Sequence, residues 1–204
     1  MKSESRRRSN QIQVSEFWDW FRSVAAGLEQ NPTNQTLVRE LDRRVRRLRP
    51  DLSWEIGPGL SKAWQFVVSP NLNRDLQETA RSIVALAPVL SSWEFYSARQ
   101  PKKWDYKFRL GNERLPMDAS GWTFVLLEYP DGAHEVLLKG KPLPPMTKDE
   151  RWQAAAITLE SILGEDMLLD TIDEFDLVDE LEPRFTDRQR PIQQLREAVT
   201  GKGS

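Results

Sequence analysis

The spacing of the apolar residues changes after Pro50, and this change constrains the fold more than any other feature of the sequence. Up to Pro50, apolar side chains recur every three to four residues, which is the period of a helix that buries one face. The pattern predicts a helix over residues 16–29, capped by Ser15, and a second helix that begins at Asn31-Pro32 and ends at Pro50. The chain therefore begins with a predicted helical hairpin.

After Pro50 the apolar residues alternate with polar ones, which is the period of a strand. Two alternating runs around Gly57-Pro58-Gly59 predict a first β-hairpin, and the turn Pro130-Asp131-Gly132 predicts a second one. A helical stripe and a further alternating run follow each hairpin. The order strand, strand, helix, strand therefore occurs twice.

The two helices that follow the hairpins have recognisable ends. The first is expected over residues 72–87, with Asn71 as its cap. The second follows a Thr147–Glu150 capping box and should end at Gly164. A last strand is expected over residues 172–178.

These elements predict an α+β fold, in which an N-terminal helical hairpin precedes two ββαβ units that form a mainly antiparallel sheet with helices on one face. Residues 1–12 are expected to be a disordered tail, 13–182 a single domain, and 183–204 a C-terminal helix and tail. We take residues 53–98 and 122–178 as a hypothetical internal repeat. An ordinary α+β meander without duplication explains the same pattern.

Tryptophan is abundant, with eight residues in 204, and each lies at or near an element that is predicted to pack. Trp152, for example, belongs to the stripe that the helix after Thr147 is expected to bury. We therefore predict that most tryptophans are core residues, because each can bury up to about 250 Å².

The rare residue types exclude whole classes of chemistry. The chain has no cysteine, which excludes disulfides and thiol catalysis, and its single histidine excludes a multi-histidine metal centre. It has no glycine-rich phosphate loop and no Gly-x-Ser-x-Gly elbow. No cofactor is therefore expected.

Charge and hydropathy also limit the partners. With 29 basic and 31 acidic residues, the net charge of −2 argues against a surface that is basic throughout. No run of about 18 apolar residues occurs, and polar residues follow Arg6, Arg7 and Arg8, so neither a membrane span nor a signal peptide is expected. The sequence predicts a cytoplasmic protein.

His134 is the one histidine and lies beside Glu135 in the second hairpin. One interpretation makes it a general base. The other makes it a surface residue that contacts the neighbouring strand. The sequence favours the second, because nothing near His134 resembles a nucleophile.

Residues 160–182 carry ten acidic side chains and no basic one. Clustered carboxylates suit a hard cation, which would make the chain a metal-assisted hydrolase, but their spacing does not fit a calcium loop. A solvated strand or a partner-docking surface explains them better. Asp173, Glu174 and Asp176 are its candidate residues, and Glu174 and Asp176 should share the outer side of the last strand.

Six arginines lie between residues 39 and 49. Arg39, Arg43 and Arg46 fall on the helix face opposite the apolar stripe, so they are candidates for docking a partner. The acidic partner surface can belong to the same chain, to a second copy or to another protein.

Arg99, Lys102, Lys103, Trp104 and Tyr106 combine basic and aromatic side chains. Such a segment can neutralise phosphates and stack on bases, so the alternative function is single-stranded nucleic-acid binding. The net charge and the lack of a recognisable nucleic-acid motif count against it.

Several short strings occur together in the chain. They are Phe17-Trp18-Asp19-Trp20-Phe21, the stretch 50–58, Ala87-Pro88 with Trp93, Ala98-Arg99-Gln100-Pro101, and Leu163-Gly164-Glu165. In combination, over residues 16–180, they resemble a family of uncharacterised bacterial proteins that share an N-terminal Phe-Trp-x-Trp-Phe motif and a late Leu-Gly-Glu motif. The resemblance implies a bacterial, soluble protein and transfers no catalytic residue. The acidic segment after Leu-Gly-Glu departs from the family pattern.

The sequence as a whole favours a non-enzymatic, cytoplasmic protein-binding module, with another protein or a second copy as its partner. Single-stranded nucleic-acid binding is the first alternative, and a metal-assisted hydrolase is the second.

Overall fold

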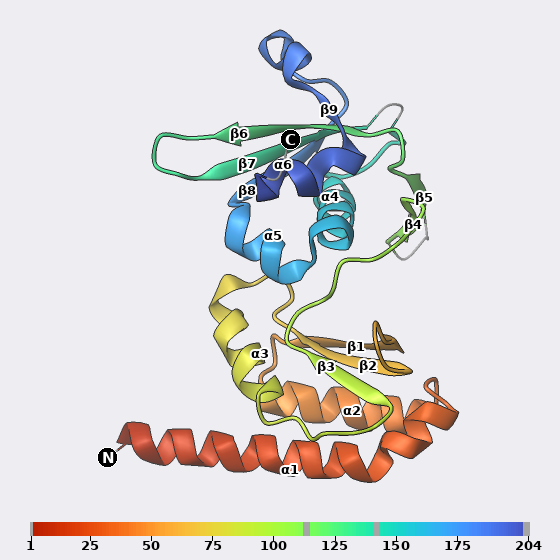
Figure 1. The fold of residues 1–204 in the computed structure, drawn as a ribbon, viewed down its shortest axis with the longest axis vertical. Helices are drawn as coiled ribbons and strands as arrows, with labels where there is room; N and C mark the ends of the chain where they lie inside the picture. Colours follow the sequence, from red (N-terminus) through yellow and green to blue (C-terminus); the bar gives the residue numbers. More distant parts are fainter. Residues whose placement is uncertain (1, 112–114, 141–142, 202–204) are drawn as a thin grey trace. The chain divides into compact units, whose positions relative to one another are not determined.

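The structure, a computed structural model, describes residues 2–111, 115–140 and 143–201, with side chains from Asn10 onward. The chain divides into two compact units, Met1–Arg99 (unit 1) and Gln100–Ser204 (unit 2). The boundary falls inside the range for which the sequence predicted a single domain. The helices and strands confirm the α+β class and the N-terminal pair of helices (Figure 1).

Unit 1 contains the helical pair and a three-stranded sheet. Its helices are α1 (Lys2–Gln30), α2 (Gln35–Leu48) and α3 (Gln77–Val84), and the 3-10 turn η1 (Arg74–Leu76) precedes α3. Its strands are β1 (Ser53–Pro58), β2 (Trp64–Ser69) and β3 (Trp93–Tyr96). β1 and β2 form the predicted antiparallel hairpin, and β3 joins β2 in parallel after the α3 crossover.

Unit 2 contains two sheets. β4 (Lys107–Leu110) and β5 (Leu115–Asp118) form a two-stranded ribbon. The second sheet has the order β8-β7-β6-β9, made of β6 (Thr123–Glu128), β7 (His134–Lys139), β8 (Glu174–Val178) and the short β9 (Arg190–Pro191). The helices are α4 (Lys148–Leu163), α5 (Glu165–Thr171) and α6 (Leu195–Thr200), with 3-10 turns η2 (Pro183–Arg188) and η3 (Ile192–Gln194).

The two larger sheets share one pairing scheme. In each, an antiparallel hairpin is followed by helix and then by a strand that pairs in parallel with the second hairpin strand. The described strands nevertheless form three sheets, not the one mainly antiparallel sheet that the sequence predicted. Alternation predicts which residues share a face of one strand, but it carries no information about which strands pair. The internal repeat stays a hypothesis.

The ends of several helices differ from the prediction. α1 begins at Lys2, so residues 2–12 are helical where the sequence predicted a disordered tail, and Ser15 lies inside the helix. The Lys, Glu, Arg and Gln residues of this segment propagate a helix readily once it has started. The side chain of Asn34, not Asn31, caps α2, and Asn73, not Asn71, caps η1.

Both predicted ends of α4 are confirmed. The Thr147 hydroxyl accepts a hydrogen bond from the Glu150 backbone at 3.2 Å, and the Glu150 carboxylate accepts one from the Thr147 N–H at 2.8 Å. Gly164 ends α4 with a φ of +82°, a conformation that glycine adopts without steric cost.

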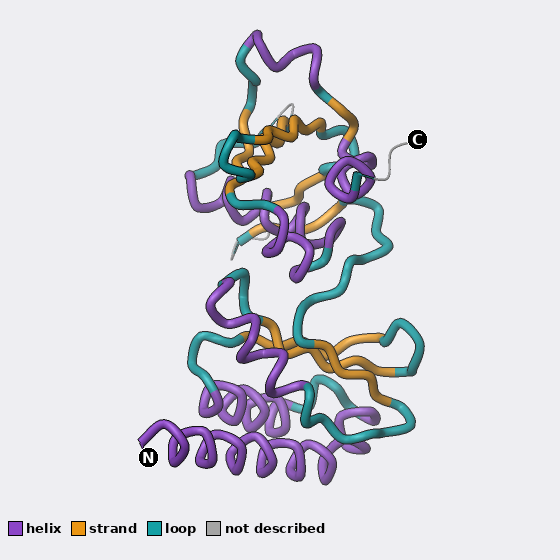
Figure 2. Tube along the Cα trace, turned by 60° about the vertical axis from the view of Figure 1, so that its left-hand side comes forward, coloured by secondary structure: helices purple, strands orange, loops and turns teal. Residues whose placement is uncertain are grey.

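The core of unit 1 is aromatic. Phe17 and Phe21 of α1 pack on Phe66 of β2 at ring-centroid distances of 6.1 and 5.0 Å. α1, α2 and α3 all contribute buried side chains to this core, and α1 and α2 lie along the sheet in both Figures 1 and 2. The rings of α1 and of the β1–β3 sheet therefore form one packed interior.

Three tryptophans of this core also make hydrogen bonds between elements. The indole N–H of Trp18 donates to the Ile83 carbonyl at 2.8 Å, that of Trp93 to Glu29 at 2.6 Å, and that of Trp54 to Asp42 at 3.2 Å. These bonds join α1 to α3, β3 to α1 and β1 to α2. A buried indole that keeps its hydrogen bond adds specificity to apolar packing.

Trp152 is an exception among the tryptophans. Its side chain is 49% exposed and stacks on Phe175 at 5.6 Å, so its predicted burial is wrong. Small residues explain the difference, because Ala154, Ala155 and Ala156 bring this part of α4 close to its neighbours and fill the interior in place of the indole.

Candidate functional site

The exposed face of α2 carries the basic side chains that the sequence singled out. Leu41 and Val45 are fully buried and hold the helix against the core, which leaves the arginines on the outer side. Arg39, Arg43 and Arg46 are all exposed. We call these three residues the α2 arginine face.

Two carboxylates within α2 neutralise part of this charge. Glu40 accepts hydrogen bonds from Arg43 and from Arg44, each with a shortest distance of 2.6 Å. These bonds, first from Arg43 and then from Arg44, lower the pKa of Glu40 from 4.5 to about 2. Asp42 accepts from Arg46 at 2.8 Å, which lowers the pKa of Asp42.

Three further arginines on α2 or directly after it differ from these. Within the part of the chain that the structure describes, Arg39, Arg47 and Arg49 form no ion pair. Arg44 lies over the ring of Trp20, with its guanidinium carbon 4.7 Å from the ring centroid. The helix therefore presents more positive than negative charge to solvent.

The acidic candidates lie on and before β8, in unit 2. Glu174 and Asp176 are exposed, whereas Leu177 is buried and Phe175 is half-buried, so the predicted alternation along this strand is confirmed. Asp173 has a structural contact, because its carboxylate accepts a hydrogen bond from the His134 N–H at 2.9 Å. That contact fixes the start of the β7–β8 pairing.

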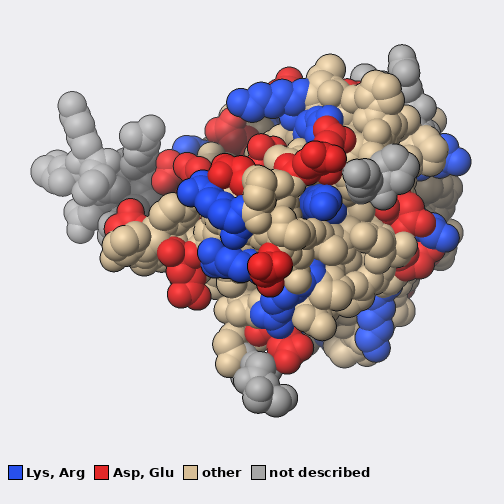
Figure 3. All heavy atoms as spheres, turned by 90° about the horizontal axis from the view of Figure 1, so that it is seen from above, with Lys and Arg blue, Asp and Glu red and all other residues tan. Residues whose placement is uncertain are grey.

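Basic and acidic side chains are interspersed on the face that Figure 3 shows. Lys and Arg lie beside Asp and Glu in small groups, and neither sign covers this face alone. This face therefore carries no extended field of one sign.

The basic and aromatic segment of unit 2 forms a cluster of rings. Trp104 lies 5.3 Å from Tyr106 and 6.0 Å from Phe108 between ring centroids, and all three rings are half-buried. Lys102, Lys103, Lys107 and Arg109 around them are exposed. We call these seven residues the basic–aromatic cluster. Tyr106 has a φ of +64°, a strained conformation for a residue with a bulky side chain.

The structure brings together most, but not all, of the residues singled out in this segment. Phe108 belongs to the ring cluster, as its place in the alternation of Trp104 and Tyr106 predicts. Arg99 does not belong to it, because it ends unit 1, where it donates to Ser53 Oγ at 2.7 Å and lies 3.7 Å from Glu55.

His134 contacts the neighbouring strand. Its Nε2 lies 3.9 Å from Glu128 across the β6–β7 hairpin, which is the cross-strand contact that the sequence favoured. Among the described residues, no three His, Asp or Glu side chains come together in a way that could hold a metal ion. No helix in the described ranges is both long enough and apolar enough to cross a bilayer.

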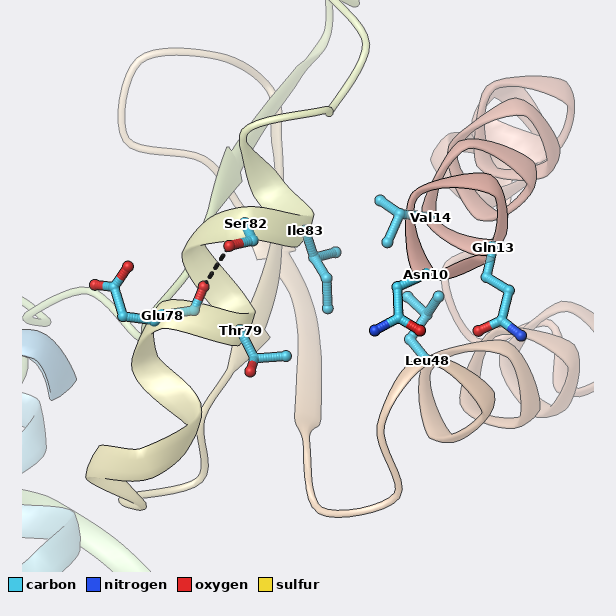
Figure 4. A pocket seen from close by; sticks show the side chains of 8 residues that line it. All are labelled: Asn10, Gln13, Val14, Leu48, Glu78, Thr79, Ser82 and Ile83. Carbon is cyan, nitrogen blue, oxygen red and sulfur yellow. Dashed lines mark hydrogen bonds between the residues drawn. The ribbon is translucent and has the colours of Figure 1, made fainter. Parts of the chain in front are cut away.

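A groove that the sequence did not reveal lies between the helices of unit 1. Asn10 and Val14 of α1 face Thr79 and Ile83 of α3 across it, Leu48 of α2 lies at its base, and Gln13 lines it on the side of α2 (Figure 4). We call it the α1–α3 groove; its volume is 280 Å³. The signal for its α1 side was Val14, which extends the stripe of Phe17 and Phe21 backward to a position just after the predicted tail.

The groove continues along α3. A neighbouring hollow of 480 Å³ shares Asn10, Val14 and Ser82 with it and reaches Ala85 and Leu86, of which Leu86 is 48% exposed. Together the two hollows have the size of a site for a few side chains of a bound molecule.

Comparison with known proteins gives no family for the chain. No protein-family model matches it, and neither a curated protein nor a solved structure shows significant similarity to it. The resemblance drawn from the aromatic strings therefore stays a prediction.

Proposed function

We propose that this protein is a non-enzymatic binding module that docks an acidic partner protein on the α2 arginine face. The observation that carries the proposal is the excess of exposed arginine over carboxylate on a helix whose other side is fixed in the core. Charged patches of this kind steer a partner of opposite sign and select its orientation. The proposal places this interaction in the cytoplasm.

Charge reversal tests the proposal. The variant R39E/R43E/R46E should lose capture of the partner in a pull-down from producing cells, while its circular dichroism spectrum stays that of the parent. The reversal K103E/K107E/R109E is the matched control, because it changes the same number of exposed charges in unit 2. Capture that survives in the first variant and is lost in the control would reject the α2 arginine face.

The basic–aromatic cluster supports a second candidate function, single-stranded nucleic-acid binding. Three half-buried rings in contact, surrounded by four exposed cations, offer both stacking and phosphate neutralisation. Intrinsic tryptophan fluorescence titrated with a thymidine oligonucleotide at low salt tests it. Binding should weaken steeply with added salt and disappear in K103E/K107E/R109E, and a flat titration of the parent would reject it.

A further inference from the structure

The α1–α3 groove has an apolar base and polar walls. Val14 and Ile83, 9% and 3% exposed, approach each other from α1 and α3, and the half-buried Leu48 lies below them. Asn10, Gln13 and Thr79 line the walls with groups that can donate or accept hydrogen bonds. Such a site accepts an apolar side chain and holds the adjoining backbone by polar contacts.

The surroundings of the groove give it a positive end. Gln13 and Leu48 also line the hollow beside it, to which α2 contributes Arg44 and Arg47. Arg44 is held by Glu40 and lies over Trp20, whereas Arg47 is exposed and forms no ion pair with any residue that the structure describes. Arg47 can therefore bind an incoming carboxylate.

Among the residues that the structure describes, two carboxylates line the groove or the hollow beside it, and they do not reverse this sign. Glu78 on the α3 side is paired with Arg81 at 2.8 Å. Glu16 lines the hollow beside Arg47 and is exposed. Against these, Arg47 in the last turn of α2 and Arg49 just after it form no ion pair with any residue that the structure describes.

We propose that the α1–α3 groove binds an acidic segment of a partner protein, with one apolar side chain inserted between Val14 and Ile83 and a carboxylate on Arg47. An acidic segment complements the positive end, and a basic segment would be repelled there. This inference rests on the proposed function and adds the apolar anchor to it. An apolar anchor in a pocket supplies the affinity that exposed charges alone do not give.

Three synthetic peptides of about 14 residues test the chemistry of the occupant, because a helix binds a groove through apolar residues three to four positions apart. One has leucine at this spacing and glutamate elsewhere, the second has lysine in place of glutamate, and the third has alanine in place of leucine. The readout is the methyl NMR spectrum of the full chain. The glutamate–leucine peptide should shift the methyl signals of Val14 and Ile83, and the lysine peptide should bind at least about tenfold more weakly.

Any one of three results would overturn the proposal. They are no shift at these methyl groups with the glutamate–leucine peptide at millimolar concentration, equal binding of the lysine peptide, or equal binding of the alanine peptide. The variant R47E should weaken the glutamate–leucine peptide and strengthen the lysine peptide. Unchanged affinity for both would remove Arg47 from the site.

A matched pair of variants separates the groove from the rest of unit 1. Ser82 and Ser23 are both exposed helix residues whose hydroxyls donate only to their own helix, to Glu78 O at 2.7 Å and to Trp20 O at 2.6 Å. S82W fills the groove and should abolish peptide binding, whereas S23W should retain it. Equal binding by both variants contradicts the proposed location.

The same variants distinguish failure of this inference from failure of the proposed function. If R39E/R43E/R46E loses the cellular partner while S82W keeps it, the arginine face stands and the groove proposal falls. If the parent chain dimerises in sedimentation and S82W does not, the occupant is a second copy, and the proposal of an acidic partner segment is wrong.

Discussion

Units 1 and 2 contain the same ββαβ pairing scheme, but different side chains make up their cores. In unit 1, Phe17, Phe21, Phe66 and Trp93 make a core of rings, and indole N–H groups join three pairs of elements. In unit 2, α4 buries Ala154, Ala155 and Ala156 together with leucines, and its tryptophan lies half in solvent. One pattern of strand pairing is thus compatible with a core dominated by aromatic rings and with a core in which alanines and leucines pack beside fewer rings.

The difference has a consequence for function. Large rings hold α1, α2 and α3 on one face of the unit 1 sheet, and the space left between the helices is the α1–α3 groove. Unit 2 uses small residues to bring α4 close to its neighbours, and its exposed features are the basic–aromatic cluster and the acidic strand β8. The two candidate functions therefore belong to different units.

The largest expected effect comes from removing a ring of the unit 1 core. Trp93→Ala should cost about 3–5 kcal/mol, because a fully buried side chain is lost together with its bond to Glu29. Trp152→Ala, in unit 2, should cost only about 1 kcal/mol, since it loses one exposed stack on Phe175. Urea denaturation measures both, and hydrogen exchange of β2 and β7 amides assigns each loss to its unit. Equal costs would contradict the contrast between the two cores.

A smaller effect is expected at the turns. A Cβ on Gly59 would lie 2.5 Å from the Lys62 carbonyl oxygen and 2.7 Å from a Glu94 carboxylate oxygen, so Gly59→Ala should destabilise unit 1 by about 1–3 kcal/mol. Gly121 in unit 2 has nothing within 4 Å of such an atom, and Gly121→Ala should stay within about 0.5 kcal/mol of the parent. Thermal denaturation compares the two. An unstable Gly121→Ala would show that unit 2 is packed more tightly than described.

Loss of a helix cap should lower the free energy of unfolding by about the same amount in both units. Thr147→Ala removes a capping box in unit 2, and Asn34→Ala removes the side chain that accepts from Thr36 and Leu37 in unit 1. Each should cost about 1 kcal/mol of unfolding free energy, measured by urea denaturation. A cost above that of Gly59→Ala for either cap would reverse the expected order of effects.

The smallest effect is an acid dependence that arises from Glu40 in α2. The pKa of Glu40 is lowered from 4.5 to about 2 by Arg43 and Arg44, so its contribution to folding is present above pH 4.5 and is lost as the pH falls toward 2. The carboxyl carbon of Glu40 should titrate near pH 2 by NMR, and R43A should move that midpoint upward. A midpoint near pH 4.5 in the parent chain would mean that Arg43 and Arg44 do not hold the Glu40 carboxylate when the protein is in solution.

Sequence patterns predicted much of the fold and less of the site. Local signals sufficed for the β1–β2 and β6–β7 hairpins and for the Thr147 capping box, because turn residues and caps act over a few positions. The separation into three sheets depends on long-range pairing, which alternation does not encode. The start of α1 was missed because a polar segment gives no apolar period.

The candidate site shows the same limit. Exposure of Arg39, Arg43 and Arg46 followed from the apolar stripe of α2. Which arginines are neutralised by Glu40 and Asp42 required side-chain geometry. The α1–α3 groove combines residues 10–14, 48 and 79–86, and no local pattern could bring these three segments together.

The central claim is that a partner docks on unit 1 through α2. The most direct measurement is the affinity of the purified partner for the parent chain, for R39E/R43E/R46E and for K103E/K107E/R109E, by calorimetry at low salt. The account predicts a loss of about 100-fold or more in the first variant and parental affinity in the second, because like charges brought together at an interface cost several kcal/mol. Parental affinity in the first variant with a loss in the second would contradict it and transfer the binding site to the basic–aromatic cluster.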